Sequence, residues 1–415
     1  MRRAVITGLG PVTPIGIGKE AFWDGLVAGR SAVRRITRFD ASVLRSQIAA
    51  EVDFDPVPFF DARTLKRLDR FSQFSVAAAR LAVEDAGLVL EREDGDRVGV
   101  SLGTALGGTG FGEMQFDNFK TRGLRGVDPT LALLVFGGAG SCNIAIALGC
   151  AGPSTANANS CASGTIAIGQ ALEWIRGDRA DVVLAGGAEA PLAPLCYGAF
   201  TLIRAMSCRN DEPERACRPF DAGRDGFIMG EGAALLVVEE LEHARARGAR
   251  IYGEILGSGM TNDAFHMTAP RPDGSQAARA MTLALADAGI LPGEIDYVNA
   301  HGSSTPLNDR TETLALKRVF GDDARRLPVS STKGHHGHPL GAAGAIEAAA
   351  CLLAMERGFL PPTVNLETPD PECDLDFIPR AGRAQPARTV LSNSFGFGGI
   401  NACVVLRRWS ADAPG

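Results

Sequence analysis

The sequence predicts an α/β protein in which one structural unit occurs twice and a mainly parallel sheet is covered by helices on both faces. Short apolar segments with strand character alternate with segments of helical spacing, which is typical of such sheets. Leu81–Leu88 recurs in similar form as Leu283–Ile290, at an offset of 202 residues. Asp181–Leu184, before a glycine turn, resembles Arg388–Leu391 at an offset of 207. Two matches at nearly one offset predict a duplication.

The duplication divides the chain into residues 1–250 and residues 251–415. In the first half, Arg2–Thr7 is predicted as a buried strand that ends at Gly8, and the helical spacing of Phe71–Ala86 predicts a helix. The other expected elements of this half are strand Val98–Leu102, helix Thr165–Arg176, strands Asp181–Leu184 and Ala233–Glu239, and helix Glu240–Arg247. In the second half we expect strands Arg250–Gly257 and Asp296–Val298 and helix Ala345–Met355.

Composition and charge exclude several classes of protein. The chain has 415 residues and a formal net charge of −6, which argues against a general nucleic-acid binder. Its nine cysteines form no CxxC pair, which favours a reducing compartment. Leu131–Gly152 runs 22 residues without a charge, but five glycines interrupt it, so we expect a helix buried in a large core. The prediction is a soluble, cytoplasmic protein that does not bind membranes.

Cys161 lies where small polar residues give way to a long apolar helical pattern. Ala158–Ser160 is predicted as the end of an extended segment, which places the thiol in a tight strand-to-helix turn. Free N–H groups and the helix dipole favour negative charge at such a point, so we expect a lowered thiol pKa. The alternative is a small buried hydrophobic residue, the usual state of a free cysteine.

Four of the six histidines lie in two clusters after residue 300. His301 follows a predicted strand, and the end of a strand in an open α/β sheet is where ligands tend to bind. The second cluster runs from Lys333 to His338, before a helix whose one carboxylate is Glu347. A buried carboxylate needs a cationic partner, and Lys333 is the candidate. We predict no metal site, because the nearby Asp and Glu residues lack ligand spacing.

A third cluster, Ser392–Asn401, is a glycine-rich turn between two predicted strands. Its backbone N–H groups are candidates for oxyanion donors, although the glycines also suit a simple tight hairpin. A thiol at a helix start, two histidine clusters, a lysine and a donor loop together indicate acyl transfer through a thioester.

With these clusters in place, the chain resembles a β-ketoacyl-acyl-carrier-protein synthase of the elongating type I/II, closest to type II, in the thiolase-fold superfamily. The resemblance covers nearly the whole chain. It rests on these segments: Val5–Gly10, Arg218–Gly226, Gly230–Gly232, Asn299–Gly302 and Phe395–Gly399. It implies two duplicated βαβαβαββ halves in a five-layered αβαβα fold, the first half carrying the nucleophile and the second the histidines and the oxyanion loop.

The resemblance also implies a role for each matching residue. Cys161 would carry the acyl group, and His301 and His338 would stabilise the enolate formed when malonyl-carrier protein loses CO₂. The N–H groups of Cys161 and Phe397 would form the oxyanion hole, and Phe397 would gate the acyl pocket. The supporting residues would be Lys333, Glu347, Phe395 and Asp309. The peripheral groups would be an acyl channel (Leu106, Phe200), a pantetheine site (Thr268, Ser303, Thr305) and a docking patch (Arg63, Lys66, Arg67, Arg204).

The implied partner is an acyl carrier protein whose 4′-phosphopantetheine carries the substrates, so the enzyme would need no cofactor of its own. The expected assembly is a homodimer, and the alternative is a heterodimer with a chain-length factor. Three departures from the family pattern bear on specificity: Ser303 and Ile400 stand where threonine is usual, and Gly334-His335-His336 replaces Ser-Met-Thr.

The catalytic set separates this chain from its relatives. A thiolase needs a second cysteine in the C-terminal glycine loop, whereas Cys403 lies beyond that loop. Initiating synthases replace one histidine with asparagine, and chain-length factors lack the nucleophile. The leading prediction is fatty acid elongation, and the alternative is the catalytic subunit of a type II polyketide or polyene synthase.

Overall fold

The strands form one mixed sheet made of two halves with the same topology. The computed structural model describes residues 1–379 and 381–410. The first half of the sheet consists of β1 (Ala4–Thr13), β5 (Val98–Gly103), β6 (Ser154–Asn157), β7 (Val182–Glu189) and β8 (Gly232–Glu240). The second half consists of β9 (Gly253–Asn262), β10 (Tyr297–Asn299), β11 (Val329–Ser330), β14 (Thr389–Gly396) and β15 (Ile400–Arg408).

The strand order is β6-β5-β7-β8-β1 in the first half and β11-β10-β14-β15-β9 in the second. If the strands of each half are numbered along the chain, both orders are 3-2-4-5-1. The 3-2 and 2-4 pairs are parallel in both halves, and the 4-5 and 5-1 pairs are antiparallel. This identity confirms the predicted duplication. The prediction of a mainly parallel sheet is wrong, because two of the four pairings in each half are antiparallel. A short antiparallel pairing of Ala4–Ile6 in β1 with β9 joins the halves.

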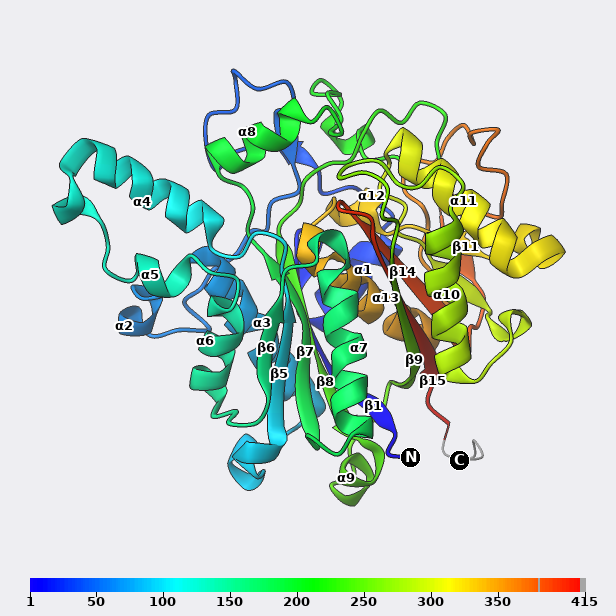
Figure 1. Cartoon of the computed structure of the whole chain (residues 1–415), viewed down its shortest axis with the longest axis horizontal. Helices are drawn as coiled ribbons and strands as arrows, with labels where there is room; N and C mark the ends of the chain where they lie inside the picture. The colour runs from blue at the N-terminus through cyan, green and yellow to red at the C-terminus, as the bar shows by residue number, and fades with distance from the viewer. Residues whose placement is uncertain (380, 411–415) are drawn as a thin grey trace.

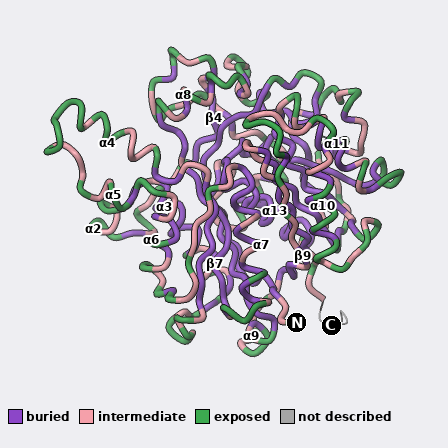
Figure 2. The backbone as a smooth tube through the Cα atoms, in the orientation of Figure 1, coloured by how far each residue is buried: buried purple, intermediate pink, exposed green. Residues whose placement is uncertain are grey.

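Two central helices separate the half-sheets, and further helices cover the outer faces, which gives five layers (Figure 1). The central layer is α7 (Ser163–Arg176) and α13 (Ala343–Arg357); Figure 2 shows α13 buried in the middle of the molecule. The outer helices are α3 (Arg70–Ala86) and α6 (Ala139–Leu148) on the first half, and α10 (Ser275–Ala288) and α11 (Pro306–Phe320) on the second.

The remaining elements are short or lie at the periphery of the fold. The helices are α1 (Lys19–Val27), α2 (Ala62–Leu65), α4 (Thr109–Arg122), α5 (Leu131–Leu134), α8 (Pro194–Leu202), α9 (Leu241–Ala246) and α12 (Lys333–His336). The strands are β2 (Gly16–Ile17), β3 (Arg34–Arg35), β4 (Ile48–Ala49), β12 (Phe359–Leu360) and β13 (Arg383–Ala384).

The repeated sequence forms the C-terminal ends of α3 and α10. Each helix ends at a glycine in the left-handed region, Gly87 with φ 57° and Gly289 with φ 66°. A residue without Cβ adopts this conformation at little cost, and the turn satisfies the last carbonyls of the helix. The repeated sequence therefore belongs to equivalent helices on the outer faces of the two half-sheets.

The predicted end of the first strand is wrong, because β1 continues through Gly8 and Gly10 to Thr13. A Cβ on Gly8 would lie 2.1 Å from the carbonyl oxygen of Ala82, and one on Gly10 would lie 2.0 Å from that of Ala78. These glycines do not form a turn. They allow α3 to pack directly on the backbone of the strand.

The uncharged stretch from Leu131 to Gly152 does not form one buried helix as expected. It forms α5 and α6, and Gly137 and Gly138 lie between the two. Ile146 on α6 is 81% exposed. Together with α4, which the sequence did not predict, α5 projects from the left flank of the molecule in Figure 1. No helix in the described residues is long and apolar enough to cross a membrane.

Candidate active site

The predicted catalytic residues meet at the C-terminal ends of the parallel strands of both halves. Cys161 follows β6, His301 follows β10, Lys333 and His338 follow β11, and Phe397 follows β14. Strands of the two halves point their C-terminal ends toward one region, which is where open α/β sheets bind ligands. A pocket of about 320 Å³ lies there, lined by Cys161, His301, His338 and Phe397 among others.

Cys161 lies in a 3₁₀ turn, Ser160–Ala162, directly before α7. Ser160 has φ 52°, so the turn is sharp and the thiol stands at the start of the helix. Burial raises the pKa of the Cys161 thiol, and the hydroxyl of Ser160, the charge of Lys333 and the N–H of Phe397 act in the opposite direction. The expected lowering of this pKa is therefore wrong, because the thiol is only 5% exposed and loses its hydration.

Lys333 connects His301 to Glu347 inside the protein. Its ammonium group donates to a carboxylate oxygen of Glu347, to the carbonyl oxygen of His301 at 2.6 Å and to the Nδ1 atom of His301 at 3.4 Å. All three side chains are buried, and burial raises the pKa of Glu347 to about 7. Because a lysine donates to Nδ1, the ring proton of neutral His301 is on Nε2. The predicted partnership of Lys333 with Glu347 is present.

His301 and His338 face each other with their ring centroids 5.2 Å apart and their planes at 78°. Burial and the nearby charge of Lys333 lower the pKa of both rings well below the usual value. At neutral pH both are therefore uncharged imidazoles. The ring of His338 packs edge-on against Phe227, with centroids 5.6 Å apart, which holds its orientation.

Phe397 lies between the open pocket and a closed apolar cluster. Its ring stacks on Phe200 and meets Phe227 edge-on, at centroid distances of 6.5 and 6.3 Å. Leu106 and Phe200 pack into the cluster, which also contains Cys161 and Leu340. The structure does not bring Leu106 or Phe200 to the lining of the open pocket. Phe395, the other aromatic residue of this loop, packs against His301 at 6.0 Å.

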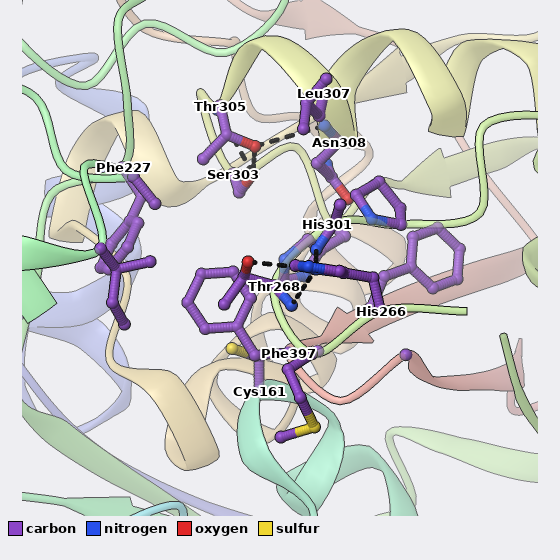
Figure 3. A pocket seen from close by; sticks show the side chains of 18 of the residues that line it. Cys161, Phe227, His266, Thr268, His301, Ser303, Thr305, Leu307, Asn308 and Phe397 are labelled. Carbon is purple, nitrogen blue, oxygen red and sulfur yellow. Dashed lines mark hydrogen bonds between the residues drawn. The ribbon is translucent and has the colours of Figure 1, made fainter. Parts of the chain in front are cut away.

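The three predicted pantetheine-binding hydroxyls line the pocket. The hydroxyls of Ser303 and Thr305 lie 2.9 Å apart, and Thr268 lies on a separate loop beside His266. Figure 3 shows Ser303 and Thr305 on the side of the pocket opposite Cys161. Serine in place of the usual threonine at position 303 thus keeps its hydroxyl at the pocket.

The four predicted docking residues do not form one patch in the chain. Arg204 lines the mouth of the pocket, whereas Arg63, Lys66 and Arg67 lie on and just after α2, on the left flank in Figure 1. All four side chains are exposed.

Two buried carboxylates on α11 also support the site, and only Asp309 of the two was predicted. Asp309 on α11 accepts a hydrogen bond from the backbone N–H of Phe220 at 2.8 Å. Glu312, which the sequence analysis missed, accepts the N–H groups of His301 and Gly302 at 2.9 and 2.8 Å. The signal for Glu312 was a second carboxylate one turn after Asp309, on the helix face that follows the histidine loop.

The unusual pair His335 and His336 does not line the pocket. The Nε2 atom of His335 lies 3.0 Å from the carbonyl oxygen of Pro362, and that of His336 lies 3.1 Å from the hydroxyl of Thr332. Their Nδ1 atoms find no partner in the described part of the chain. Burial lowers the pKa of His335 to about 4 and that of His336 to about 3. The pair is therefore neutral in the folded protein.

We expect this pair to make the fold sensitive to acid. In the unfolded chain both rings titrate near pH 6.5, so below that pH the unfolded state binds protons that the folded state does not. Stability then falls by about 1.4 kcal/mol per pH unit for each histidine, down to the folded pKa. The variant carrying His335→Met and His336→Thr should lose this slope between pH 6.5 and 4. Urea unfolding of both proteins at several pH values measures it.

The raised pKa values of the buried glutamates have the opposite sign. Glu312 and Glu347, with folded pKa values of about 7, contribute stability below their unfolded pKa and lose it as the pH rises through 7. They are present in both proteins, so their contribution cancels in the comparison. The control is the range above pH 7, where the two proteins should show the same slope. Equal slopes from pH 6.5 to 4 would contradict the prediction.

The fold and this arrangement of a thiol, two neutral imidazoles and a lysine–glutamate pair define a condensing acyltransferase of the thiolase-fold class. The model of the β-ketoacyl synthase N-terminal domain matches residues 1–244, and that of the C-terminal domain matches residues 252–367. The chain belongs to the β-ketoacyl synthase family. It is a carbon–carbon bond-forming acyltransferase of this family's type II.

Relatives in this family align along nearly the whole chain. A 3-oxoacyl-acyl-carrier-protein synthase 2 from Coxiella burnetii is 48% identical and covers 98% of this chain and 99% of its own. The ishigamide ketosynthase/chain length factor matches with a TM-score of 0.92 and 39% identity, over 99% of this chain and 100% of that one. A type II polyketide ketosynthase, solved in complex with its acyl-carrier protein, matches with a TM-score of 0.91 and 37% identity, over 98% and 100%.

Proposed function

We propose that the chain catalyses the decarboxylative Claisen condensation of malonyl-acyl carrier protein with an acyl thioester on Cys161, in fatty acid elongation. The product is a 3-oxoacyl carrier protein two carbons longer. The observation that carries the proposal is one pocket lined by the Cys161 thiol and by the two neutral imidazoles of His301 and His338. The relative from Coxiella burnetii is named a 3-oxoacyl-acyl-carrier-protein synthase 2, which supports fatty acid elongation.

The first half-reaction is transfer of the acyl group to Cys161. The thiol attacks the thioester that the carrier protein brings, and the N–H groups of Cys161 and Phe397 stabilise the tetrahedral oxyanion. The carrier's thiol leaves with a proton. Phe397 then separates the acyl chain, held by the cluster that contains Leu106 and Phe200, from the pocket that receives the malonyl group.

The second half-reaction is decarboxylation and carbon–carbon bond formation. Loss of CO₂ leaves an enolate, and its oxygen accepts a hydrogen bond from the Nε2–H group of His301. His338 supplies the second neutral imidazole at this oxygen. The enolate carbon attacks the thioester carbonyl, and the Cys161 thiolate leaves. Lys333 keeps the Nδ1 atom of His301 occupied, so the Nε2 proton stays directed at the substrate.

The substrates would arrive on the 4′-phosphopantetheine arm of an acyl carrier protein, and the protein would use no cofactor of its own. The hydroxyls of Thr268, Ser303 and Thr305 line the pocket along the path of such an arm. Arg204 stands at its mouth as an exposed cation for an acidic carrier. The solved complex of a related ketosynthase with its acyl-carrier protein supports this partner.

Loading of Cys161 tests both the nucleophile and the docking residues. After incubation with acyl-carrier protein, mass spectrometry should find the acyl group on Cys161. Arg204→Glu and Arg63→Glu should each slow this loading at least about tenfold at low salt, because the charge attraction is reversed. Loading from a small acyl thioester should not change.

The matched control is Arg92→Glu, an exposed arginine at the opposite end of β5 from the pocket. Loading of this variant should match that of the wild type. An adduct on another residue would overturn the role of Cys161, and an equal effect of Arg92→Glu would overturn specific docking.

The alternative function is that of the catalytic subunit of a type II polyketide or polyene synthase. The two polyketide-type structural neighbours support it. Carrier proteins with acyl groups of graded length and unsaturation distinguish the two pathways in the loading experiment. Saturated chains on Cys161 support fatty acid elongation, and preferential loading of polyene chains supports the alternative.

We also propose that the chain forms a homodimer through the flank that includes β6 and α4 to α6. β6 is an edge strand, α6 packs beside it, and α4, α5 and α6 carry exposed apolar side chains. Such a surface is typical of an interface. The largest of these side chains are Phe116, Phe119, Leu133 and Ile146, and Phe136 lies between α5 and α6.

Sedimentation velocity should give twice the chain mass of 43.5 kDa for the wild type. Ile146→Asp should give the monomer, because a charge at the centre of an apolar interface is costly to bury. Leu291→Asp, a change at a residue 73% exposed on the other half, should stay dimeric. A monomeric wild type would contradict the homodimer and favour pairing with a chain-length factor.

A further inference from the structure

The turn that carries the catalytic thiol has a structural copy in the second half of the protein. Ser160–Ala162 precedes α7, and Leu340–Ala342 precedes α13 in the same way. Both turns begin with a non-glycine residue in the left-handed region, Ser160 at φ 52° and Leu340 at φ 40°. Gly341 therefore occupies the position in the second half that Cys161 occupies in the first.

The strands that face these two turns differ at one equivalent position. β7 and β14 correspond residue by residue, so Glu189 at the end of β7 matches Gly396 at the end of β14. A Cβ on Gly396 would lie 3.0 Å from the backbone nitrogen of Cys161, so glycine keeps the space beside the thiol open. The equivalent space beside Gly341, in the second half, holds the side chain of Glu189 from β7.

The Glu189 carboxylate is held by four donors from two segments. One oxygen accepts the N–H groups of Ala105 and Gly341 at 2.6 and 2.9 Å. The other accepts the N–H of Leu106 and the hydroxyl of Thr104, both at 3.1 Å. The side chain is 0% exposed. No lysine, arginine or histidine of the described residues forms an ion pair with it, so three backbone N–H groups and one hydroxyl hold the carboxylate. Burial raises the pKa of Glu189 to about 7, so it is an anion above that pH.

These contacts join two walls of the reaction site. Ala105 and Leu106 pack against the apolar cluster that contains Cys161 and Phe397. Gly341 lies in the turn Leu340–Ala342, three residues after His338 in the chain. The backbone of this turn is strained at Leu340, and such a conformation persists only where surrounding contacts hold it. The negative charge of Glu189 also lies near enough to Cys161 to oppose ionisation of its thiol.

We propose that Glu189 is a positioning residue whose carboxylate fills the space beside Gly341 that is equivalent to the open space beside Cys161, and thereby fixes the turn after His338 against the acyl-pocket wall. The carboxylate accepts the N–H of Gly341, which is the counterpart of the Cys161 N–H. This inference rests on the proposed roles of Cys161 and His338. If it is correct, the site needs an anion bound between the N–H groups of Gly341 and Ala105 in order to work.

Chemical rescue tests this requirement. Glu189→Ala removes the carboxylate beside Gly341. The condensation kcat should then fall at least about tenfold, while the KM for malonyl-carrier protein changes little. Formate fits the vacated space as a carboxylate, and tens of millimolar formate should restore kcat at least about fivefold. Formamide, which has the same shape without the charge, should not.

Two variants and the wild type serve as controls. Formate should not affect the wild type, because Glu189 fills the site. It should not rescue Glu189→Gln either, because the amide occupies the space and points its NH₂ group at backbone donors. Formate should also raise the melting temperature of Glu189→Ala alone. If that variant folds only with formate, refolding yield in formate against formamide is the measurement.

A readout independent of condensation separates this inference from the proposed function. Iodoacetamide alkylation of Cys161 needs no carrier protein, and its pH profile should move to lower pH in Glu189→Gln, because a nearby negative charge is removed. Glu312→Gln, a change at another buried carboxylate that binds two backbone N–H groups, should leave the profile in place. An unmoved profile together with no effect specific to formate would overturn the inference, whether or not Cys161 is the nucleophile.

Discussion

Cys161→Ala is expected to reduce condensation by at least about 10³-fold, because no other group can carry the acyl chain as a thioester. The thiol is buried at the start of α7, and alanine fits the same space with a loss of about 1 kcal/mol or less in the free energy of unfolding. Assay of 3-oxoacyl product and urea unfolding measure the two effects. Full elongation activity in this variant would overturn the mechanism.

Cys403→Ala is the matched control for this experiment. Cys403 is also fully buried, and it lies on β15 beyond the glycine loop, near where a thiolase would need its second cysteine. Condensation should be unchanged by this substitution, because no step of the proposed mechanism uses the thiol.

Cys161→Gln separates the two half-reactions. Its amide resembles the acylated thiol in size, so malonyl-carrier protein should bind and lose CO₂ without a partner for condensation. CO₂ release depends on the neutral imidazoles of His301 and His338, which this substitution does not touch. Absence of CO₂ release in Cys161→Gln would count against the roles of the two histidines.

Lys333→Met is expected to lower both activity and stability. Removing one partner of a fully buried ion pair costs about 3 kcal/mol, because Glu347 is left without its cation in an apolar helix. The loss also frees the Nδ1 atom of His301, so the ring proton is no longer confined to Nε2. We expect decarboxylation to fall at least about 10²-fold.

The double variant Lys333→Met with Glu347→Leu distinguishes structure from chemistry. An apolar pair of similar volume removes the unpaired carboxylate, so most of the lost stability should return. Activity should remain low, because His301 still lacks its donor. Recovery of decarboxylation together with stability would show that Lys333 acts only through folding.

Much of the fold followed from local patterns in the sequence. The echo between Leu81–Leu88 and Leu283–Ile290 predicted the duplication, because the same amphipathic spacing and terminal glycine produce the same helix end on both sheets. The end of β1 could not be predicted this way. Gly8 and Gly10 are typical of turns, and only the packing of α3 against the strand shows why glycine is needed within it.

The sequence by itself determined the chemical identity of the site: a thiol at a helix start, two histidines, a lysine with a carboxylate, and a glycine-rich donor loop. These groups occur in motifs whose spacing is local, so they are visible without a structure. The tertiary structure decided the ionisation of the site and its supporting contacts. Burial raised the pKa of Cys161 against the effect of the helix start, and Glu189 and Glu312 gained roles through backbone contacts with residues 84 and 11 positions away in the chain. Desolvation and long-range hydrogen bonds depend on what the folded chain places around a group, and no local pattern carries that information.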